Sequence, residues 1–398
     1  MIAFRSLTLA ALAFFPPPSD AQTGVCTGVH AGVIRHLRIH AEPREYCAWP
    51  SLARTREGDL IVLFTKSEEH LGPDGAIMLS RSTDNGTTWA PPVIVLDSPL
   101  DDREAGVTTL RDGRILGHFW STFHTRKSYG ALPPNSYGRD LLERWTTIVE
   151  HPEYRNSERY AGPRSAVSGD GGRTWRVVGR GHDSVHGGIE LASGCLLVAS
   201  YRDTGDGITI HAADSAAGPW RRLAAIPSPQ PDSVSFGEPH MTQLPSGRVV
   251  MMIRATAHPY DDRDDRCVLW ESYSDDEGMT WARPFATPLW GFPPHLTLLS
   301  DGRVLCTYGY RRPPYGERAC VSNDGVRWDP RDEVILRDDA PNGDLGYPAS
   351  IELSPGVILT VYYQADVPPG TVQRMAPPDP GRTKPGILGT VWKVPPPR

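Results

Sequence analysis

The chain has 398 residues, with 39 glycines, 39 prolines and a net charge of −6 from 41 basic and 47 acidic side chains. No run of Lys or Arg dominates any segment, so the composition argues against a nucleic-acid partner or an anionic membrane surface. The length fits either two average domains or one large all-β domain.

The N-terminal segment is typical of a secretory signal peptide. It carries a single Arg5, an apolar stretch from Leu7 to Phe15, three prolines and small residues near Ala21. The apolar stretch is too short to span a bilayer, and no later segment is long and apolar enough to do so. We therefore predict a signal peptide at 1–21, a mature domain at 22–398 and a secreted or periplasmic location.

The six cysteines are widely scattered, at positions 26, 47, 195, 267, 306 and 320. They form no C-x-x-C pair and no His/Cys cluster at zinc spacing, so we predict neither a structural metal nor a cofactor. Cys306 and Cys320 are placed to lie on neighbouring strands, where a disulfide is feasible in an oxidising compartment.

An eight-residue repeat, S-x-D-x-G-x-T-W, is the strongest pattern in the chain. Three full copies, one copy shortened by a residue and one decayed copy occur at 82–89, 168–175, 274–281, 322–328 and 212–220. The Asp accepts backbone N–H groups and the Gly takes a left-handed backbone, which is the chemistry of a hairpin turn. We refer to these segments as boxes and predict a structural role for them.

A second repeat, of strand, tight turn and strand, interleaves with the boxes. It occurs six times, at 49–64, 105–120, 187–202, 238–254, 294–311 and 347–363. Six hairpins at roughly 50-residue intervals, most followed by a box, predict an all-β, six-bladed β-propeller. Either 32–40 or 387–394 would complete the last blade. An insertion at 125–160, with a helix expected at 140–150, is either a lid or rim on one face or a solvated loop.

Boxes on a six-bladed propeller resemble the sialidase (neuraminidase) superfamily over nearly the whole mature chain. The resemblance implies a tyrosine nucleophile backed by a glutamate, an aspartate acid/base on a first-blade loop and three arginines that bind the substrate carboxylate. Boxes also occur in other propellers, so the function has to be argued from the site.

Two hairpins carry the clearest correspondence. Glu238 opens the fourth hairpin in an E-x(5)-L-x-x-G-R pattern, and Arg254 ends it. A turn centred on Ser246 would place 238 opposite 254. The pair resembles the glutamate and second arginine of the family, and Tyr347 in Gly-Tyr-Pro-Ala-Ser resembles the nucleophile. Without the repeat, an ion pair and a packed aromatic ring would be the simpler interpretations.

The third and first arginines of the family have no single counterpart in the chain. The third has three candidates in the fifth blade: Arg311, Arg312 and Arg318. The first arginine is missing, because Ala48 or Trp49 stands in its place. Gln364 replaces the glutamate that supports this arginine in the family. The two losses agree with each other, because a buried carboxylate without its cation would be costly. Three other arginines are candidates to compensate: Arg44, Arg103 and Arg202.

The loop at 65–75 would supply the acid/base, and it offers Glu68, Glu69, His70 and Asp74. We predict Glu69 for that role on its distance from the first box, and His70 as a substrate-binding neighbour. Asp102 is expected to add an acidic wall to the pocket.

Three functional hypotheses follow, each for a monomer with a glycan as its substrate or ligand. The first is a retaining exo-glycosidase that releases sialic acid or a related acidic sugar. The second is a hydrolase or lyase acting on another acidic polysaccharide sugar, with a base among His118, His124, His186, His240 and His295. The third is a propeller that binds glycans without catalysis.

Overall fold

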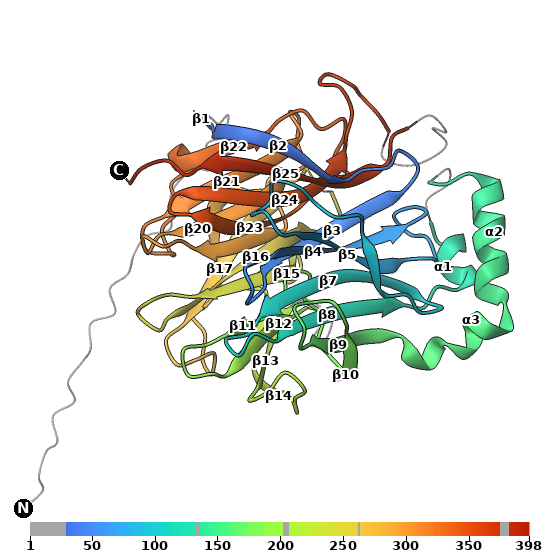
Figure 1. Cartoon of the computed structure of the whole chain (residues 1–398), viewed down its shortest axis with the longest axis horizontal. Helices are drawn as coiled ribbons and strands as arrows, with labels where there is room; N and C mark the ends of the chain where they lie inside the picture. Colours follow the sequence, from blue (N-terminus) through green and yellow to red (C-terminus); the bar gives the residue numbers. More distant parts are fainter. Residues whose placement is uncertain (1–28, 133–135, 202–206, 262, 375–381, 398) are drawn as a thin grey trace, which may run out of the picture.

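The chain folds into six small antiparallel sheets arranged in a ring, as the computed structural model shows (Figure 1). The structure describes residues 29–132, 136–201, 207–261, 263–374 and 382–397. Six sheets in a ring confirm the prediction of an all-β, six-bladed β-propeller. The predicted signal peptide at 1–21 lies outside the described residues.

The first three blades each have four strands, which follow one another from the inner edge to the outer. The first contains β3 (Tyr46–Arg54), β4 (Leu60–Ser67), β5 (Ala76–Ser82) and β6 (Val93–Leu96). The second contains β7 (Asp101–Thr109), β8 (Ile115–Thr122), β9 (Gly162–Ser168) and β10 (Arg176–Arg180). The third contains β11 (Ile189–Glu190), β12 (Leu196–Ser200), β13 (Gly207–Ala213) and β14 (Arg221–Pro227).

The other three blades follow the same order. The fourth contains β15 (Val234–Gln243), β16 (Val249–Ala257), β17 (Val268–Ser274) and β18 (Phe285–Trp290). The fifth contains β19 (Pro294–Leu298), β20 (Val304–Tyr310), β21 (Gly316–Ser322), β22 (Glu333–Arg337) and, parallel to β22, β1 (Val29–His30). The sixth contains β23 (Gly346–Ser354), β24 (Val357–Ala365), β25 (Pro385–Lys393) and β2 (Gly32–His40).

The core lies between the blades. Each neighbouring pair of blades buries a separate apolar cluster, from sixth against first round to fifth against sixth. Both faces of the middle strands are therefore covered, and strands such as β4 and β12 are buried along nearly their whole length.

Both segments that were candidates to complete the last blade belong to it. β25 pairs with β24 on one side and with β2 on the other. The N-terminal β2 is therefore the outer strand of the sixth blade, and the chain passes directly from it into β3, the inner strand of the first blade. This passage closes the ring.

The boxes form the turns between the third and fourth strands of their blades. In the second blade, the Asp170 carboxylate accepts the backbone N–H groups of Arg173 and Thr174 at 3.0 and 2.9 Å. It also accepts the Thr174 hydroxyl at 2.6 Å, and the Ser168 hydroxyl accepts the Gly172 N–H at 2.8 Å. The same pattern recurs around Asp84 and Asp276, so these three segments are hairpin turns.

The insertion in the second blade is helical and packs around its own apolar cluster. It contains α1 (Arg126–Gly130), α2 (Arg139–Glu150), α3 (Pro152–Asn156) and the 3₁₀ turn η1 (Glu158–Tyr160). A second 3₁₀ turn, η2 (Pro330–Asp332), precedes β22. The side chain of Trp145 is completely buried, and its indole N–H donates to Glu68 at 2.9 Å. The helix expected at 140–150 is therefore present as α2.

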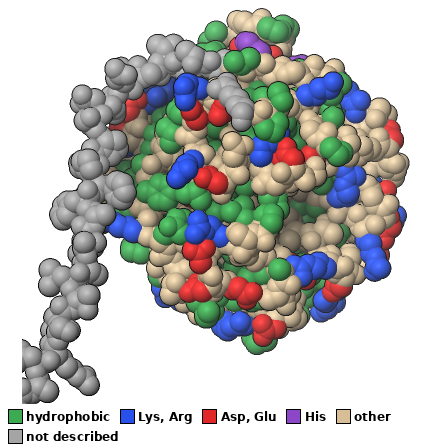
Figure 2. Space-filling model, turned by 90° about the vertical axis from the view of Figure 1, so that its left-hand side faces the viewer, with side chains coloured by type: hydrophobic (Ala, Val, Ile, Leu, Met, Phe, Trp, Pro, Cys, Tyr) green, Lys and Arg blue, Asp and Glu red, His purple; other side chains and the backbone are tan. Residues whose placement is uncertain are grey.

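Figure 2 shows the face that lies opposite these helices, where basic and acidic side chains are interspersed rather than gathered by sign. Within the described ranges, no helix combines the length and apolarity that a membrane crossing requires.

Candidate functional site

Four of the six inner strands carry the same irregularity. In each, two residues face a single residue of the neighbouring strand, which defines a β-bulge. The bulged pairs are Trp49–Pro50, Glu104–Ala105, Glu238–Pro239 and Tyr347–Pro348. The bulges lie at equivalent positions in the first, second, fourth and sixth blades.

The bulge corrects the expected register of the fourth hairpin. Arg254 pairs with Gly237, not with Glu238. Pro239 has no N–H to continue the ladder, which favours the bulge, and Glu238 is displaced from the strand. The consequence is that its side chain leaves the sheet and points into the axial end of the ring.

The first residue of each bulge has a left-handed backbone. The φ angles of Trp49, Glu104, Glu238 and Tyr347 are 55°, 58°, 41° and 51°. Residues with a Cβ atom disfavour this conformation, and residues strained in this way cluster at functional sites. All four residues line one cavity of about 460 Å³.

The rest of the cavity wall comes from strand ends and loops. Besides the bulge residues, its wall contains His70, Leu71, Arg103, Thr122, Tyr137, Tyr260, Arg254, Arg311 and Asp344. Tyr137 comes from the insertion and Tyr260 from the loop after β16. The insertion therefore forms part of the rim, one of the two roles that the sequence left open.

Glu238 joins the tyrosine to an arginine. The Tyr347 hydroxyl donates to Glu238 Oε1 at 2.6 Å, and Arg254 donates to Glu238 Oε2 at the same distance. Burial, followed by the nearby Glu238 carboxylate, raises the pKa of Tyr347 well above its ordinary value. The phenol is therefore neutral, and its proton already lies on the line to a carboxylate oxygen.

Of the three fifth-blade candidates, Arg311 is the one at the cavity. Arg254 and Arg311 both lie against the ring of Phe292, with guanidinium carbons 4.5 and 5.0 Å from its centroid. The guanidinium of Arg312 points outward and binds Asp265. Arg318, on β21, is buried, and its guanidinium lies over the ring of Tyr310. Chain position does not distinguish these three arginines, whereas the directions of their side chains do.

In the first blade, Trp49 lies on the cavity wall, at one of the two positions where the resemblance had implied an arginine. The Arg103 guanidinium lies over the Trp49 ring, 4.2 Å from its centroid, and binds Asp101 at 3.1 Å. Arg103, one of the proposed substitutes, thus brings a positive charge from the second blade to that part of the wall.

Two acidic residues named from the sequence lie elsewhere. Glu69 is buried in ion pairs with Arg382 and with Lys384, the latter at 3.1 Å, and is absent from the cavity wall. Asp102 is also buried off the wall, where it accepts from Ser98 N–H and the Ser121 hydroxyl. Asp102 adjoins the wall residue Arg103 on β7, and adjacent residues on a strand point to opposite sides, so Asp102 misses the cavity.

The carboxylate of Asp344 was not foreseen. The Tyr46 hydroxyl donates to it at 2.8 Å and also contacts His70 Nδ1 at 2.5 Å. Burial alone would raise the pKa of Asp344, but hydrogen bonding and charge from His70 outweigh it and hold the pKa below its ordinary value. Asp344 lies in an irregular loop before β23, so no repeat marked it.

Glu104 was also missed, although the sequence contained a signal for it. Residues 104–114 fit the same E-x(5)-L-x-x-G-R pattern as 238–248. Aligning the two hairpins places Glu104 at the position of Glu238, at the same bulge in the second blade. Comparing all the repeats position by position would have found it.

The five histidines proposed for a lyase are buried, and none of them is on the cavity wall. His186, His240 and His295 gather near one another, with ring centroids 4.2 to 5.5 Å apart. Burial lowers the pKa of His240 and of His118 to about 3. The rings of His240 and His118 are therefore neutral groups in the interior.

No family model and no curated protein sequence matches the chain. Among solved structures, a protein of unknown function from Dyadobacter fermentans is 21% identical with a TM-score of 0.69, over 91% of this chain and 99% of that one. The NanB sialidase of Streptococcus pneumoniae, as its K499G mutant, is 13% identical with a TM-score of 0.59, over 90% and 70%.

A third similar structure is an α-L-arabinanase from Penicillium chrysogenum in complex with arabinobiose. It is 14% identical with a TM-score of 0.55, over 91% of this chain and 98% of that one. Sialidases and arabinan-degrading enzymes thus share this arrangement of blades. The chain therefore has the six-bladed propeller fold that these solved structures share.

Proposed function

We propose that the protein is an exported retaining exo-glycosidase of sialidase type, which hydrolyses terminal sialic acid or a related acidic sugar. The observation that carries the proposal is the 2.6 Å hydrogen bond from Tyr347 to Glu238. Glycan binding alone does not require a tyrosine held in a strained backbone with its hydroxyl on a buried carboxylate. Nucleophilic catalysis does, because the weak nucleophile needs an adjacent base.

A neutral nucleophile suits a sugar with a carboxylate on its anomeric carbon. A carboxylate nucleophile at about 4 Å would meet a repulsion of about 4 kcal/mol at an effective dielectric of 20. Tyr347 avoids this cost, because it becomes nucleophilic only as Glu238 takes up its proton. Tyrosine is the known exception to the two-carboxylate scheme of glycosidases.

Arg254, Arg311 and Arg103 would bind the carboxylate of the substrate. A guanidinium offers two parallel N–H donors to a carboxylate and stays charged. Arg254 and Arg311 approach from the fourth and fifth blades, and Arg103 supplies the charge that Trp49 lacks. This substitution favours an acidic sugar whose carboxylate lies closer to the second blade.

The acid/base role, predicted for Glu69, falls to a group on the wall. Asp344 is the poorer general acid, because its pKa is held low and it is therefore ionised. His70, which contacts Asp344 through Tyr46, and Glu104, which accepts from the Tyr201 hydroxyl at 3.3 Å, both face the cavity. Replacing the acid/base residue should lower the turnover of substrates with a good leaving group only a little, because they need no protonation as they leave.

The test is release of the fluorophore from a fluorogenic α-sialoside by the purified protein and by Tyr347→Phe. We expect turnover by the wild type and a loss of about 10³-fold or more in the variant, with an unchanged melting temperature. Unsaturated products from uronate polymers, without release from sialosides, would favour the lyase instead. Glycan binding without turnover would favour a non-catalytic propeller.

A second candidate is exo-hydrolysis of a neutral arabinan-type sugar. The observation that favours it is Glu104, a second carboxylate that lines the cavity with Glu238, next to the apolar surface of Trp49. Two carboxylates are the usual pair for glycoside hydrolysis. An aryl α-L-arabinofuranoside assayed beside the sialoside separates the two, because Tyr347→Phe should spare the arabinosidase and Glu104→Gln should abolish it.

A further inference from the structure

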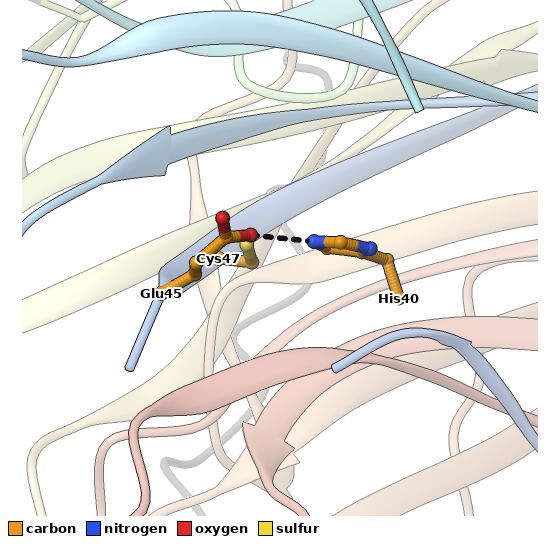
Figure 3. A group of neighbouring side chains, drawn as sticks. All are labelled: His40, Glu45 and Cys47. Carbon is orange, nitrogen blue, oxygen red and sulfur yellow. Dashed lines mark hydrogen bonds and ion pairs between the residues drawn. The ribbon is translucent and has the colours of Figure 1, made fainter. Parts of the chain in front are cut away.

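A second cluster of chemically active side chains lies away from the cavity, where the ring closes. His40 ends β2, Glu45 lies in the turn that follows, and Cys47 is the second residue of β3. Figure 3 shows the three side chains converging. One ligand atom from each, an imidazole nitrogen, a carboxylate oxygen and the thiol sulfur, lies within 4.8 Å of the other two.

The spacing of these atoms suits a small metal ion. In a tetrahedral zinc site with ligand bonds of about 2.0–2.3 Å, neighbouring ligand atoms are about 3.4 Å apart. His40 Nε2 and Glu45 Oε2 are now hydrogen-bonded at 2.8 Å. An ion would therefore have to part them by less than about 1 Å, which rotation of the two side chains can provide.

The surroundings orient two of the three groups. Lys66 donates to Glu45 Oε1 at 2.9 Å, which leaves Oε2 directed at His40. The ring of His40 stacks on Phe64, with centroids 5.8 Å apart and planes 25° apart. Partners that fix the direction of metal ligands in this way commonly strengthen metal sites.

The cluster also has an open side. Cys47 is fully buried, whereas the side chains of His40 and Glu45 are 15% and 33% exposed. Glu45 and Lys66 line a cavity of about 380 Å³ that shares no wall residue with the cavity around Tyr347. This cavity reaches the cluster at Glu45, which gives an ion a path of entry.

We propose that His40, Glu45 and Cys47 bind a zinc-like divalent transition-metal ion that ties β2 to β3. Imidazole and thiolate favour such ions over magnesium or calcium. Cys47 would bind as the thiolate, with its proton released to solvent, and one thiolate with one carboxylate neutralises the ion. The ion would fasten the outer strand of the sixth blade to the inner strand of the first.

The sequence predicted no metal, because H-x(4)-E-x-C matches no familiar zinc spacing. The proposal is also independent of the glycosidase, since the two sites share no residue. It can therefore be tested whether or not the protein cleaves a glycan.

Cobalt is the probe, because a cobalt–thiolate bond adds a charge-transfer band in the near ultraviolet. The full chain, stripped by a chelator, is titrated with Co²⁺, and Zn²⁺ is then added. We expect one equivalent to bind with this band, and Zn²⁺ to displace it and raise the melting temperature. Cys47→Ser should remove the band and weaken binding by at least roughly tenfold.

The matched control is Cys195→Ser, which removes a partly buried thiol in the third blade and should keep the band. His40→Gln, at a partly exposed ring, provides a second variant if Cys47→Ser fails to fold. Absence of the band at saturating cobalt in the wild type would overturn the proposal. So would a band that survives Cys47→Ser or is lost with Cys320→Ser, because the ion would then be bound by other thiols.

Discussion

The two ends of the blades use the same backbone conformation for different purposes. At the turn end, Asn85 and Glu277 in the boxes have φ angles of 57° and 58°, and neither side chain is buried. At the cavity end, the four bulge residues have φ angles between 41° and 58°, and their side chains are buried. The difference lies in what the side chain does once the backbone has turned.

In the boxes the left-handed residue serves only the turn. The second-blade box has Gly171 at this position, with a φ of 70°, where the first has Asn85 and the fourth has Glu277. Glycine satisfies the turn equally well, because only the backbone matters there. At the bulges no glycine would serve, because the displaced side chains form the wall of the cavity. A left-handed residue whose side chain cannot be replaced by glycine therefore marks the end of the blades that carries the cavity.

Of the changes that compare the two ends of the blades, Glu238→Gln should have the greatest consequence. The amide keeps the size of the side chain but cannot take up the proton of Tyr347, so kcat/KM for an α-sialoside should fall by about 10²–10⁴-fold. Glu277→Gln makes the same chemical change at the same backbone conformation in a box, and should leave activity unaltered. Equal activity of the two variants would contradict the assignment of the cavity.

The second-largest effect is expected at Glu271, a buried carboxyl next to a box, and it depends on pH. Glu271 accepts the indole N–H of Trp328 at 2.6 Å, and burial raises its pKa to about 8. The folded protein therefore holds a proton that the unfolded chain, with its ordinary carboxyl pKa, has lost. Stability from this group is full at low pH and is lost as the pH rises toward 8.

Glu271→Gln should remove this dependence, since the amide oxygen still accepts the indole N–H. Relative to wild type, the variant should gain stability of the order of a few kcal/mol between pH 5 and pH 8. Denaturant unfolding at the two pH values measures this. A gain that is the same at both pH values would show that Glu271 is not protonated in the folded state.

Asp170→Ala should cost less and should spare the cavity. The change removes two backbone hydrogen bonds and two side-chain hydrogen bonds that hold the second-blade turn. Because the turn is exposed, we expect a loss of roughly 1–2 kcal/mol in the free energy of unfolding. Asp170→Asn is the conservative control, because it retains an acceptor oxygen, and kcat/KM should be unchanged in both.

Glu277→Gly should have the mildest consequence. Relief of a left-handed backbone is worth about 1–2 kcal/mol, of which the added chain entropy of glycine offsets about 0.5–1. A net gain of about 0.5 kcal/mol in the free energy of unfolding should result, with unchanged activity. A loss of stability instead would mean that the box side chain has a structural role of its own.

Much of the fold was predictable, because turns and strands depend on residues that are close together in the sequence. The Asp, Gly and Trp of each box are close in sequence and define their own hairpin, and six repeated hairpins, most followed by a box, predicted six blades. The positions of Glu238, Arg254 and Tyr347 at strand openings followed from the same repeats. Their roles in catalysis stay predictions until the assays above are done.

Side-chain direction was not predictable in the same way. Glu69 and His70 are neighbours in one loop, yet only His70 faces the cavity while Glu69 binds Arg382 from the other end of the chain. Arg311 and Arg312 differ likewise. Both pairs lie in loops between strands, so the path of each loop in the folded chain sets which of the two neighbours faces the cavity.

The number of blades, the turn chemistry and the strand openings could all be predicted from the chain alone, because each depends on residues a few positions apart. Which charges share the cavity depends instead on how separate blades pack and on where a bulge displaces a side chain. The meeting of His40, Glu45 and Cys47 depends in the same way on the strands that close the ring. Both are set by the closed ring, which no local pattern encodes.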